Sequence, residues 1–168
     1  NGLPHNQVRS IHKDENADLW VTTAAGIVKL RKPQPAEFQV YAPRTLLPYI
    51  KTVSLYDKDT DTLWIGTAGG GLARLKNGTL SVYGTEAGLP HPTITYLYKD
   101  RMKNLWIGTD GGGLSRFGNG KFSTLRSGDG LADGFVYAIT EDREGGLWVG
   151  TLDGGLHRLS DGKFTTYT

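Results

Sequence analysis

Four tryptophans stand at almost equal intervals along the chain, and they constrain its fold more than any other feature. Trp20, Trp64, Trp106 and Trp148 are separated by 44, 42 and 42 residues. Each lies in a similar run of sequence, clearest in the last three copies as LWIGTAGGGLARL, LWIGTDGGGLSRF and LWVGTLDGGLHRL. A period in the forties predicts a supersecondary unit repeated in tandem. Residues present in every copy are therefore expected to pack the repeat, and function is expected where the copies differ.

Each copy contains four short segments with the composition of β-strands. They are rich in β-branched and aromatic residues and are bounded by Gly, Asn, Asp or Pro. Turn pairs such as Asn77-Gly78 and Asn119-Gly120 suit antiparallel hairpins. Four antiparallel strands repeated in this way predict an all-β fold made of β-propeller blades within one unit, residues 1–168. The four predicted blades cover residues 1–43, 44–85, 86–127 and 128–168.

The first strand of each blade carries an aliphatic residue nine positions before the tryptophan. These residues are Ile11, Leu55, Leu97 and Ile139. The Leu-Trp-Ile run of the second strand is apolar on both faces, as expected for a sheet sandwiched between neighbouring blades. An isolated blade would expose both faces, so we expect the blades to stack into a ring.

Composition excludes several classes of function. The 19 basic and 17 acidic residues are interspersed, which gives no support to a nucleic-acid interface. The absence of Cys excludes disulfides and thiol catalysis. No apolar run approaches the roughly 18 residues of a membrane span, so we expect no membrane contact by this segment. No cofactor is expected.

The repeat resembles the two-component regulator propeller repeat. The resemblance rests on Gly-Leu-Pro, Val-x-x-Ile, Leu-Trp-Ile-Gly-Thr-x-Gly-Gly-Gly-Leu-x-Arg-Leu and Gly-x-Phe-x-x-Tyr, and it covers the whole chain. Repeats three (Gly88–Arg126) and four (Gly130–Tyr167) match best, and repeat one least. The resemblance implies a periplasmic or extracytoplasmic sensing region of bacterial sensor kinases, built as seven-bladed propellers that in some bacteria respond to oligosaccharides. The family implies no catalytic residues and no fixed ligand residues.

Four blades are fewer than the usual ring of that family, so ring closure is an open question. A closed four-bladed ring, an arc completed by a second copy, and a fragment of a larger ring are the alternatives. Both ends of the sequence fall on repeat boundaries, as in a unit cut from or copied out of a longer array. We favour two chains pairing into one eight-bladed ring, because an arc would leave two apolar faces bare.

Several recurrent residues are predicted to be structural. The four tryptophans could stack on sugars, but their presence in every copy indicates core packing. The glycine triplets 69–71 and 111–113 lack the Lys-Ser/Thr and the following helix of a phosphate loop, so turn geometry and close approach explain them better. The recurrent cations predict an ion pair or a stack on an aromatic ring; they are Lys29, Arg74, Arg116 and Arg158.

One acidic turn resembles the start of a calcium loop. Asp57, Asp59 and Asp61 occupy positions 1, 3 and 5 of such a loop. However, Thr62 replaces the expected Gly at position six, and Ala68 replaces the Glu at position twelve. We therefore favour a solvated acidic turn over a metal site.

The variable loops are the predicted binding region. Loops that enter each blade and loops that join its second and third strands are expected on the same side of the ring. Varied polar and aromatic side chains on such loops are typical both of binding sites and of unselected loop tips. The candidate ligand residues are His5, Tyr49, His91 and Asp133, each fifteen before a tryptophan, together with Asp110 and Asp153.

These observations predict a non-catalytic module of a bacterial sensor that recognises a ligand or partner, with a small polar molecule or oligosaccharide as the candidate ligand. The first alternative is a propeller lyase of the streptogramin-inactivating type, which would need a metal-assisted acid/base set that does not stand out in this sequence. The second is a purely structural set of blades.

Overall fold

The computed structural model of the chain describes residues 2–31, 37–43 and 53–168. They form four separate four-stranded sheets in which consecutive strands pair antiparallel. The first sheet contains β1 (Val8–Lys13), β2 (Leu19–Thr23), β3 (Gly26–Arg31) and β4 (Glu37–Pro43), and the second contains β5 (Val53–Asp57), β6 (Thr62–Gly66), β7 (Leu72–Lys76) and β8 (Thr79–Tyr83). The third sheet contains β9 (Ile94–Lys99), β10 (Leu105–Thr109), β11 (Leu114–Gly118) and β12 (Lys121–Leu125). The fourth contains β13 (Val136–Glu141), β14 (Leu147–Thr151), β15 (Leu156–Ser160) and β16 (Lys163–Tyr167).

The helices of the described chain are three 3-10 turns of three residues each, which are too short to cross a membrane. They are η1 (Lys58–Thr60), η2 (Thr85–Ala87) and η3 (Ser127–Asp129).

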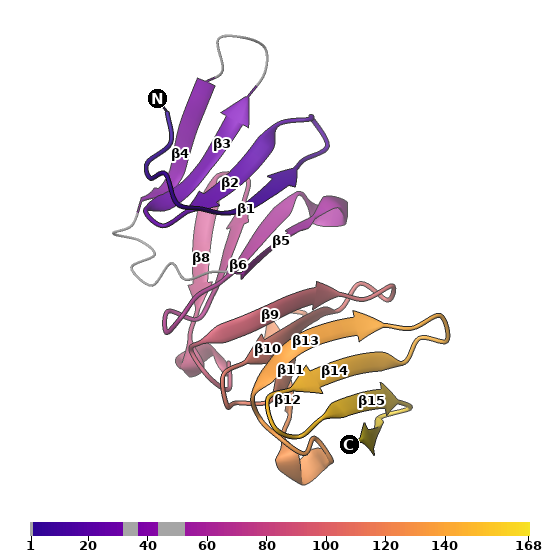
Figure 1. Ribbon diagram of the computed structural model, residues 1–168. Helices are drawn as coiled ribbons and strands as arrows, with labels where there is room; N and C mark the ends of the chain where they lie inside the picture. Colours follow the sequence, from indigo (N-terminus) through magenta and orange to yellow (C-terminus); the bar gives the residue numbers. More distant parts are fainter. Residues whose placement is uncertain (1, 32–36, 44–52) are drawn as a thin grey trace.

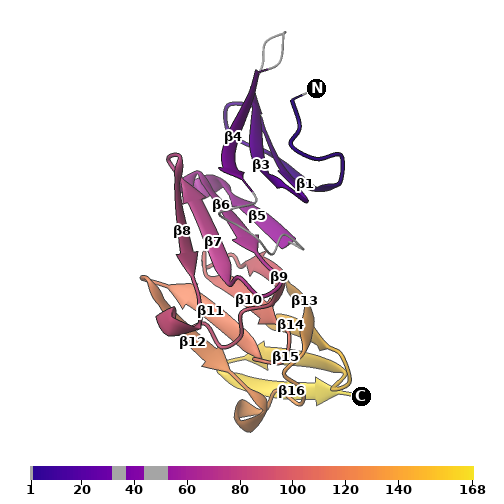
Figure 2. The ribbon, with the colours of Figure 1, turned by 90° about the vertical axis from the view of Figure 1, so that its left-hand side faces the viewer.

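The predicted all-β fold with four propeller blades is confirmed. The sheets, here called blades 1 to 4, follow one another in chain order, and blades 1 and 4 lie at opposite ends of the molecule (Figures 1 and 2). The first strands of neighbouring blades, β1, β5, β9 and β13, contact one another in sequence. The chain therefore forms an open arc with two free blade faces.

Apolar side chains fill the contact between each pair of neighbouring blades, which we call a seam. At the seam between blades 3 and 4, Trp106 and Leu114 pack against Val136, Ile139 and other residues of blade 4. Equivalent clusters fill seams 1–2 and 2–3. Trp20, Trp64 and Trp106 are only 7–9% exposed, so their predicted packing role is confirmed. Trp148, at the equivalent position of blade 4, is half-buried because it lies at the free face of that blade.

A cation lies over each tryptophan ring, as predicted from the recurrence. Each pair is directly opposite on neighbouring strands, for example Trp20 with Lys29 on β3. The cation-to-centroid distances are 5.0 Å for Lys29, 5.7 Å for Arg74, 6.0 Å for Arg116 and 6.0 Å for Arg158. The recurrent cation therefore stabilises the face of the indole ring.

Blade 2 departs from the other blades in the register of its first strand. Leu97 pairs with Ile107 and Ile139 with Val149, but Leu55 pairs with Trp64. The reason is the connection between β5 and β6, which contains η1 (Lys58–Thr60) and is one residue shorter than the connection between β9 and β10. A slip of one residue turns a strand's side chains to the opposite face. The equivalence predicted for Leu55 is therefore wrong, because this residue packs toward blade 3 and Ser54 faces blade 1.

Candidate functional site

The predicted grouping of two loop sets on one side of the arc is confirmed by backbone hydrogen bonds. The loop after β10 bonds to the connection before β9 of its own blade, through Asp110 N to Thr93 O at 3.1 Å. The same loop bonds to the connection that enters blade 4, through Gly113 N to Gly134 O at 2.9 Å. Equivalent bonds link blade 2 to blade 3 through Gly71 and Pro92. We call this side of the arc the loop face.

Threonine and glycine residues hold the loops of this face in a fixed shape. The hydroxyl of Thr109 donates to the carbonyl of Gly113 at 2.7 Å, and the same bond recurs in the other three blades. Gly113 has a positive φ of +90°, and a Cβ there would lie 2.3 Å from the Leu125 carbonyl oxygen. A Cβ on Gly112 would lie 2.7 Å from the Cβ of His91. Turn geometry and close approach thus account for this glycine triplet, as predicted.

The candidates fifteen residues before each tryptophan share a structural role that the sequence did not reveal. The side chain of each described member accepts a hydrogen bond from the backbone N–H two residues later. His5 Nδ1 accepts from Gln7 at 2.9 Å, His91 Nδ1 from Thr93 at 3.2 Å, and Asp133 Oδ1 from Phe135 at 3.1 Å. Accepting through Nδ1 places the proton of each neutral imidazole on Nε2, where it is available as a donor. Tyr49 lies outside the described residues.

The structure brings four candidates together at seam 3–4. His91 packs beside Gly112. This glycine lies between Gly111 and Gly113, whose backbone N–H groups both donate to the Gly134 carbonyl. Asp133 Oδ2 accepts a hydrogen bond from the backbone N–H of Asp153 at 3.0 Å. This bond and further backbone donors lower the pKa of Asp133. Asp110 belongs to the same group through its bonds to Thr93 and to β13, whereas His5 lies in blade 1, away from this seam.

Two aromatic residues of this region were missed by sequence reasoning. Tyr137 on β13 donates its hydroxyl across the seam to Asp110 Oδ1 at 2.9 Å. That bond, with a smaller effect from Asp133, raises the pKa of Tyr137. Tyr137 is 46% exposed and Phe135 is 40% exposed, with the Phe135 ring against Gly111. Both lie in or next to a predicted strand, so only the three-dimensional structure shows that they reach the loop face.

We call Asp110, Asp133, Phe135, Tyr137 and Asp153 the loop-face cluster. It combines two exposed aromatic rings with three carboxylates on loops that the backbone fixes. Such a surface can pack against the apolar face of a ligand while its carboxylates accept hydrogen bonds from hydroxyl or amino groups. In the described part of the chain, no three His, Cys, Asp or Glu side chains converge as metal ligands.

The acidic turn of blade 2 is engaged in hydrogen bonds and ion pairs. Asp57 caps η1 by accepting from Asp59 N at 3.0 Å, and Asp61 accepts from the Tyr56 hydroxyl at 2.8 Å. The ammonium of Lys99, from blade 3, bonds to Asp57 and lies 2.8 Å from Asp59 Oδ2. Two of the three carboxylates of the calcium candidate, Asp57 and Asp59, thus share the Lys99 ammonium, and the third bonds to Tyr56. A cation of the protein itself occupies the side of the turn that faces blade 3.

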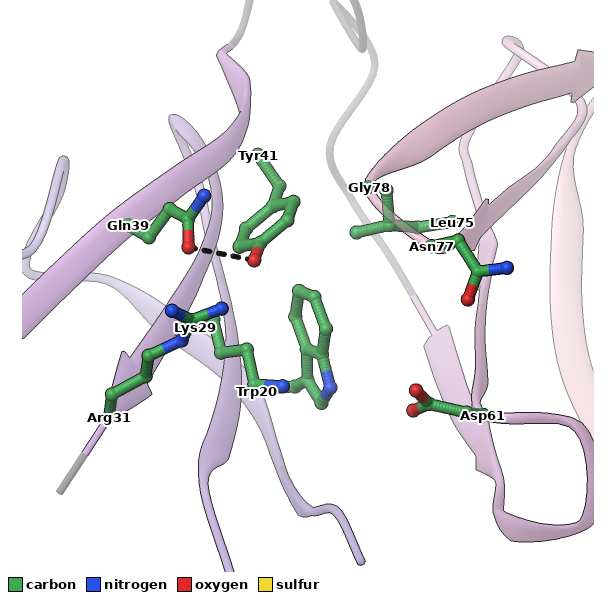
Figure 3. A pocket seen from close by; sticks show the side chains of 9 residues that line it. All are labelled: Trp20, Lys29, Arg31, Gln39, Tyr41, Asp61, Leu75, Asn77 and Gly78. Atoms are coloured by element: carbon green, nitrogen blue, oxygen red, sulfur yellow. Dashed lines mark hydrogen bonds between the residues drawn. The ribbon is translucent and has the colours of Figure 1, made fainter. Parts of the chain in front are cut away.

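A cavity of about 390 Å³ lies between blades 1 and 2, away from the loop-face cluster. Figure 3 shows Trp20 and Tyr41 on one side and Asp61 and Asn77 on the other. The Tyr41 hydroxyl donates to Gln39 Oε1 at 2.8 Å, and the Trp20 and Tyr41 rings meet edge to face at 4.8 Å. Among the described residues, the buried Nε1 of Trp20 has no hydrogen-bond partner, whereas Trp106 Nε1 donates to Asp100 at 2.8 Å.

Comparisons with known proteins match two of the four repeats to a family model and find the same fold in solved structures. Residues 88–111 and 130–153 match the family model described as "Two component regulator propeller". No curated protein matches the sequence.

Solved propellers share the fold over nearly the whole chain. The extracellular domain described as that of a hybrid two component system from B. thetaiotaomicron has a TM-score of 0.71 and 24% identity, and the match covers 99% of this chain and 22% of that one. The extracellular domain described as that of a one component system from the same organism has a TM-score of 0.72 and 20% identity, over 99% and 25% of the two chains. Virginiamycin B lyase from Staphylococcus aureus has a TM-score of 0.72 and 17% identity, over 96% of this chain and 55% of the lyase. The chain thus spans about a quarter of the two extracellular domains and about half of the lyase.

Proposed function

This chain carries two-component regulator propeller repeats, and we propose that it acts as a non-catalytic recognition module of a bacterial signal-transduction sensor. The match of the repeats to the family model supports this role, and so does the likeness to extracellular domains of bacterial signalling systems. The same likeness supports an extracytoplasmic location.

We propose further that the loop-face cluster binds a polar ligand of the oligosaccharide class. The observation that carries this proposal is the Tyr137 ring, which is exposed on the loop face and held across seam 3–4 by its hydrogen bond to Asp110. A ring fixed in this way loses little conformational freedom on binding, which favours affinity. The C–H face of a sugar ring can pack on Phe135 or Tyr137, while its hydroxyls donate to nearby carboxylates.

The position at a seam adds a route to signalling. Asp110 belongs to blade 3 and Tyr137 to blade 4, so one ligand would contact two blades at once. A ligand stabilises the arrangement to which it binds more tightly. Binding would therefore stabilise one relative placement of the two blades.

Titration calorimetry with a panel of neutral and uronic-acid oligosaccharides tests the proposal. We expect saturable heat with at least one glycan. For that glycan, Tyr137→Ala should weaken binding by a factor of about five to ten, because one aromatic contact is worth roughly 1–1.5 kcal/mol. Tyr137→Phe keeps the ring and loses the bond to Asp110, so its effect should be smaller.

Tyr167→Ala is the matched control, because Tyr167 is equally exposed but lies on β16 at the free face of blade 4. The oligosaccharide proposal fails if no glycan gives heat. The assignment to the loop-face cluster fails if Tyr137→Ala and Tyr167→Ala bind with the affinity of the unmodified chain.

A further inference from the structure

Charged side chains link the blades at the end opposite the loop face, where β1, β5, β9 and β13 end. At seam 3–4, Arg101 stands five residues before Trp106, in the turn between β9 and β10. Its Nε lies 2.9 Å from Glu141 Oε1, and its backbone N–H donates to Glu141 Oε2 at 3.0 Å. The guanidinium also donates to the carbonyls of Asp142 and Arg143. Glu141 is the last residue of β13, seven before Trp148, and its side chain is almost fully buried.

Seam 2–3 uses the same two positions with the charges reversed. Asp59 stands five residues before Trp64, and its carboxylate lies 2.8 Å from the ammonium of Lys99. Lys99 is the last residue of β9, seven before Trp106. In both seams, the side chain five before one tryptophan reaches forward to the side chain seven before the next tryptophan. Seams 2–3 and 3–4 therefore follow one rule: the two positions carry opposite charges. Seam 1–2 departs from it, because its two positions hold Glu15 and Asp57, both acidic, and the shifted register of β5 turns Asp57 toward Lys99 of blade 3.

Each free face displays one of these two positions, and its side chain has no oppositely charged partner in the described part of the chain. Arg143, five before Trp148, is exposed and would reach toward a blade after blade 4. Lys13, seven before Trp20, is exposed on the free side of blade 1. Lys13 pairs with Leu19 in the strand register, as Lys99 pairs with Leu105 and Glu141 with Leu147, so its side chain points to a preceding blade. Both free positions are cationic.

The apolar parts of the free faces also match the internal seams. Leu156 is 43% exposed on blade 4, whereas Leu114 at the same repeat position is fully buried. On blade 1, Ile11 is 60% exposed, whereas Ile139 at the same position is 2% exposed. Each free face thus repeats the surface that seams 2–3 and 3–4 bury inside the chain. Exposed apolar surface of this kind marks a contact site.

We propose that the free face of blade 4 docks a propeller blade that carries Asp or Glu seven residues before its tryptophan. By the same rule, the free face of blade 1 docks a blade with Asp or Glu five residues before its tryptophan. A second copy of this chain placed head to tail would satisfy the apolar contacts but would bring Arg143 against Lys13. Like charges across an interface select against a partner. The charges thus favour a blade of different sequence from blades 1 and 4 as the neighbour at each end.

A charge-swap cycle tests this proposal by sedimentation velocity at low salt. The four proteins are the unmodified chain, Arg143→Glu, Lys13→Glu and the double variant. Each single swap creates an opposite pair at a head-to-tail seam, so it should lower the dissociation constant for self-association by a factor of about five to ten. The double variant restores a like-charged pair and should return to the weaker association of the unmodified chain. The differences should shrink at high ionic strength, because the pair lies at the surface.

Lys121→Glu is the control, because it makes the same change of net charge at an exposed position on β12, away from both free faces. The proposal is overturned if the unmodified chain associates as tightly as the single swaps, since a second copy would then be an adequate neighbour. It is also overturned if Lys121→Glu has the same effect as Arg143→Glu, or if neither single swap associates.

Discussion

Seams 1–2 and 3–4 join neighbouring blades through the same strands of the repeat but with different chemistry. At seam 3–4 the first strand of the later blade contributes Val136 and Ile139 to a continuous apolar core. At seam 1–2 the first strand contributes Ser54, which bonds to Ser10 and lies 2.8 Å from His12 Nε2. The difference arises in a turn, because the shorter connection of blade 2 shifts its first strand by one residue. A position in the repeat therefore determines which face a side chain occupies only where the turns have equal length.

The largest expected contrast is between the two inner-strand residues that face the preceding blade. We predict that Ile139→Ala lowers the free energy of unfolding by about 2–4 kcal/mol, since it opens a cavity in a packed core. Ser54→Ala should cost about 1 kcal/mol, the usual net worth of a hydrogen bond. Urea denaturation measures both, with the exposed Ile11→Ala as the control. Equal losses for Ile139→Ala and Ser54→Ala would contradict the distinction between the seams.

The next contrast concerns the ion pairs at seams 2–3 and 3–4. Lys99→Met leaves the buried carboxylate of Asp57 without its cation, so we predict a loss of about 1–3 kcal/mol. Arg101 is half exposed, and Arg101→Met should cost about 1 kcal/mol or less. Thermal or urea unfolding at low and high salt separates the two, because the contribution of Arg101 should fall with added salt. A larger effect at Arg101 would show that its bonds to the carbonyls of blade 4 dominate.

Two histidines, His157 which is buried and His12 which is half-buried, allow blades 4 and 1 to be compared in their response to pH. Burial lowers the pKa of His157 and of His12 below the ordinary value of about 6.5, and for His12 a hydrogen bond with Ser54 opposes the shift. The unfolded chain therefore binds protons more readily than the folded one as the pH falls through 6.5. The free energy of unfolding should decrease from pH 7 to pH 5, and the decrease should stop once the folded pKa is passed.

We predict that His157→Ser, which introduces the residue found at position 115 of blade 3, reduces this pH-dependent loss. His12→Ser should reduce it less, since His12 is only half-buried. Urea unfolding at several pH values provides the measurement, with the exposed His5→Ser as the control. An unchanged pH profile for His157→Ser would show that carboxylates, and not this histidine, govern acid stability.

The smallest expected effect concerns the loop-capping position fifteen residues before each tryptophan. Asp133→Ala removes the acceptor for Phe135 N–H and Asp153 N–H, and we predict a loss of about 1 kcal/mol. Asp133→His introduces the residue that caps the same turn in blade 3, so it should restore part of that loss. If Asp133→His is no more stable than Asp133→Ala, the caps of blades 3 and 4 are not equivalent.

The fold could be predicted from the sequence because the residues of each packing interaction recur at the same positions in several repeats. The period and the strand-like segments indicated stacked four-stranded sheets, and the recurrence of the tryptophans and cations indicated structural roles; the structure confirms each of these predictions. The face occupied by Leu55 was mispredicted because register depends on a turn whose conformation one sequence pattern does not specify. The candidate site was predicted only in part. The capping bonds of His91 and Asp133 and the reach of Tyr137 across a seam depend on contacts between loops that no local pattern encodes.

The position of the fourth tryptophan provides the molecule with an optical reporter. Three indoles are enclosed in seams, whereas Trp148 lies at the free face, stacked with Arg158 and 5.3 Å from the ring of Tyr167. Its fluorescence emission is therefore the most sensitive of the four to the polarity of that face. A neighbouring blade that covers it would shift the emission to shorter wavelength, so the arrival of a partner can be followed without any added label.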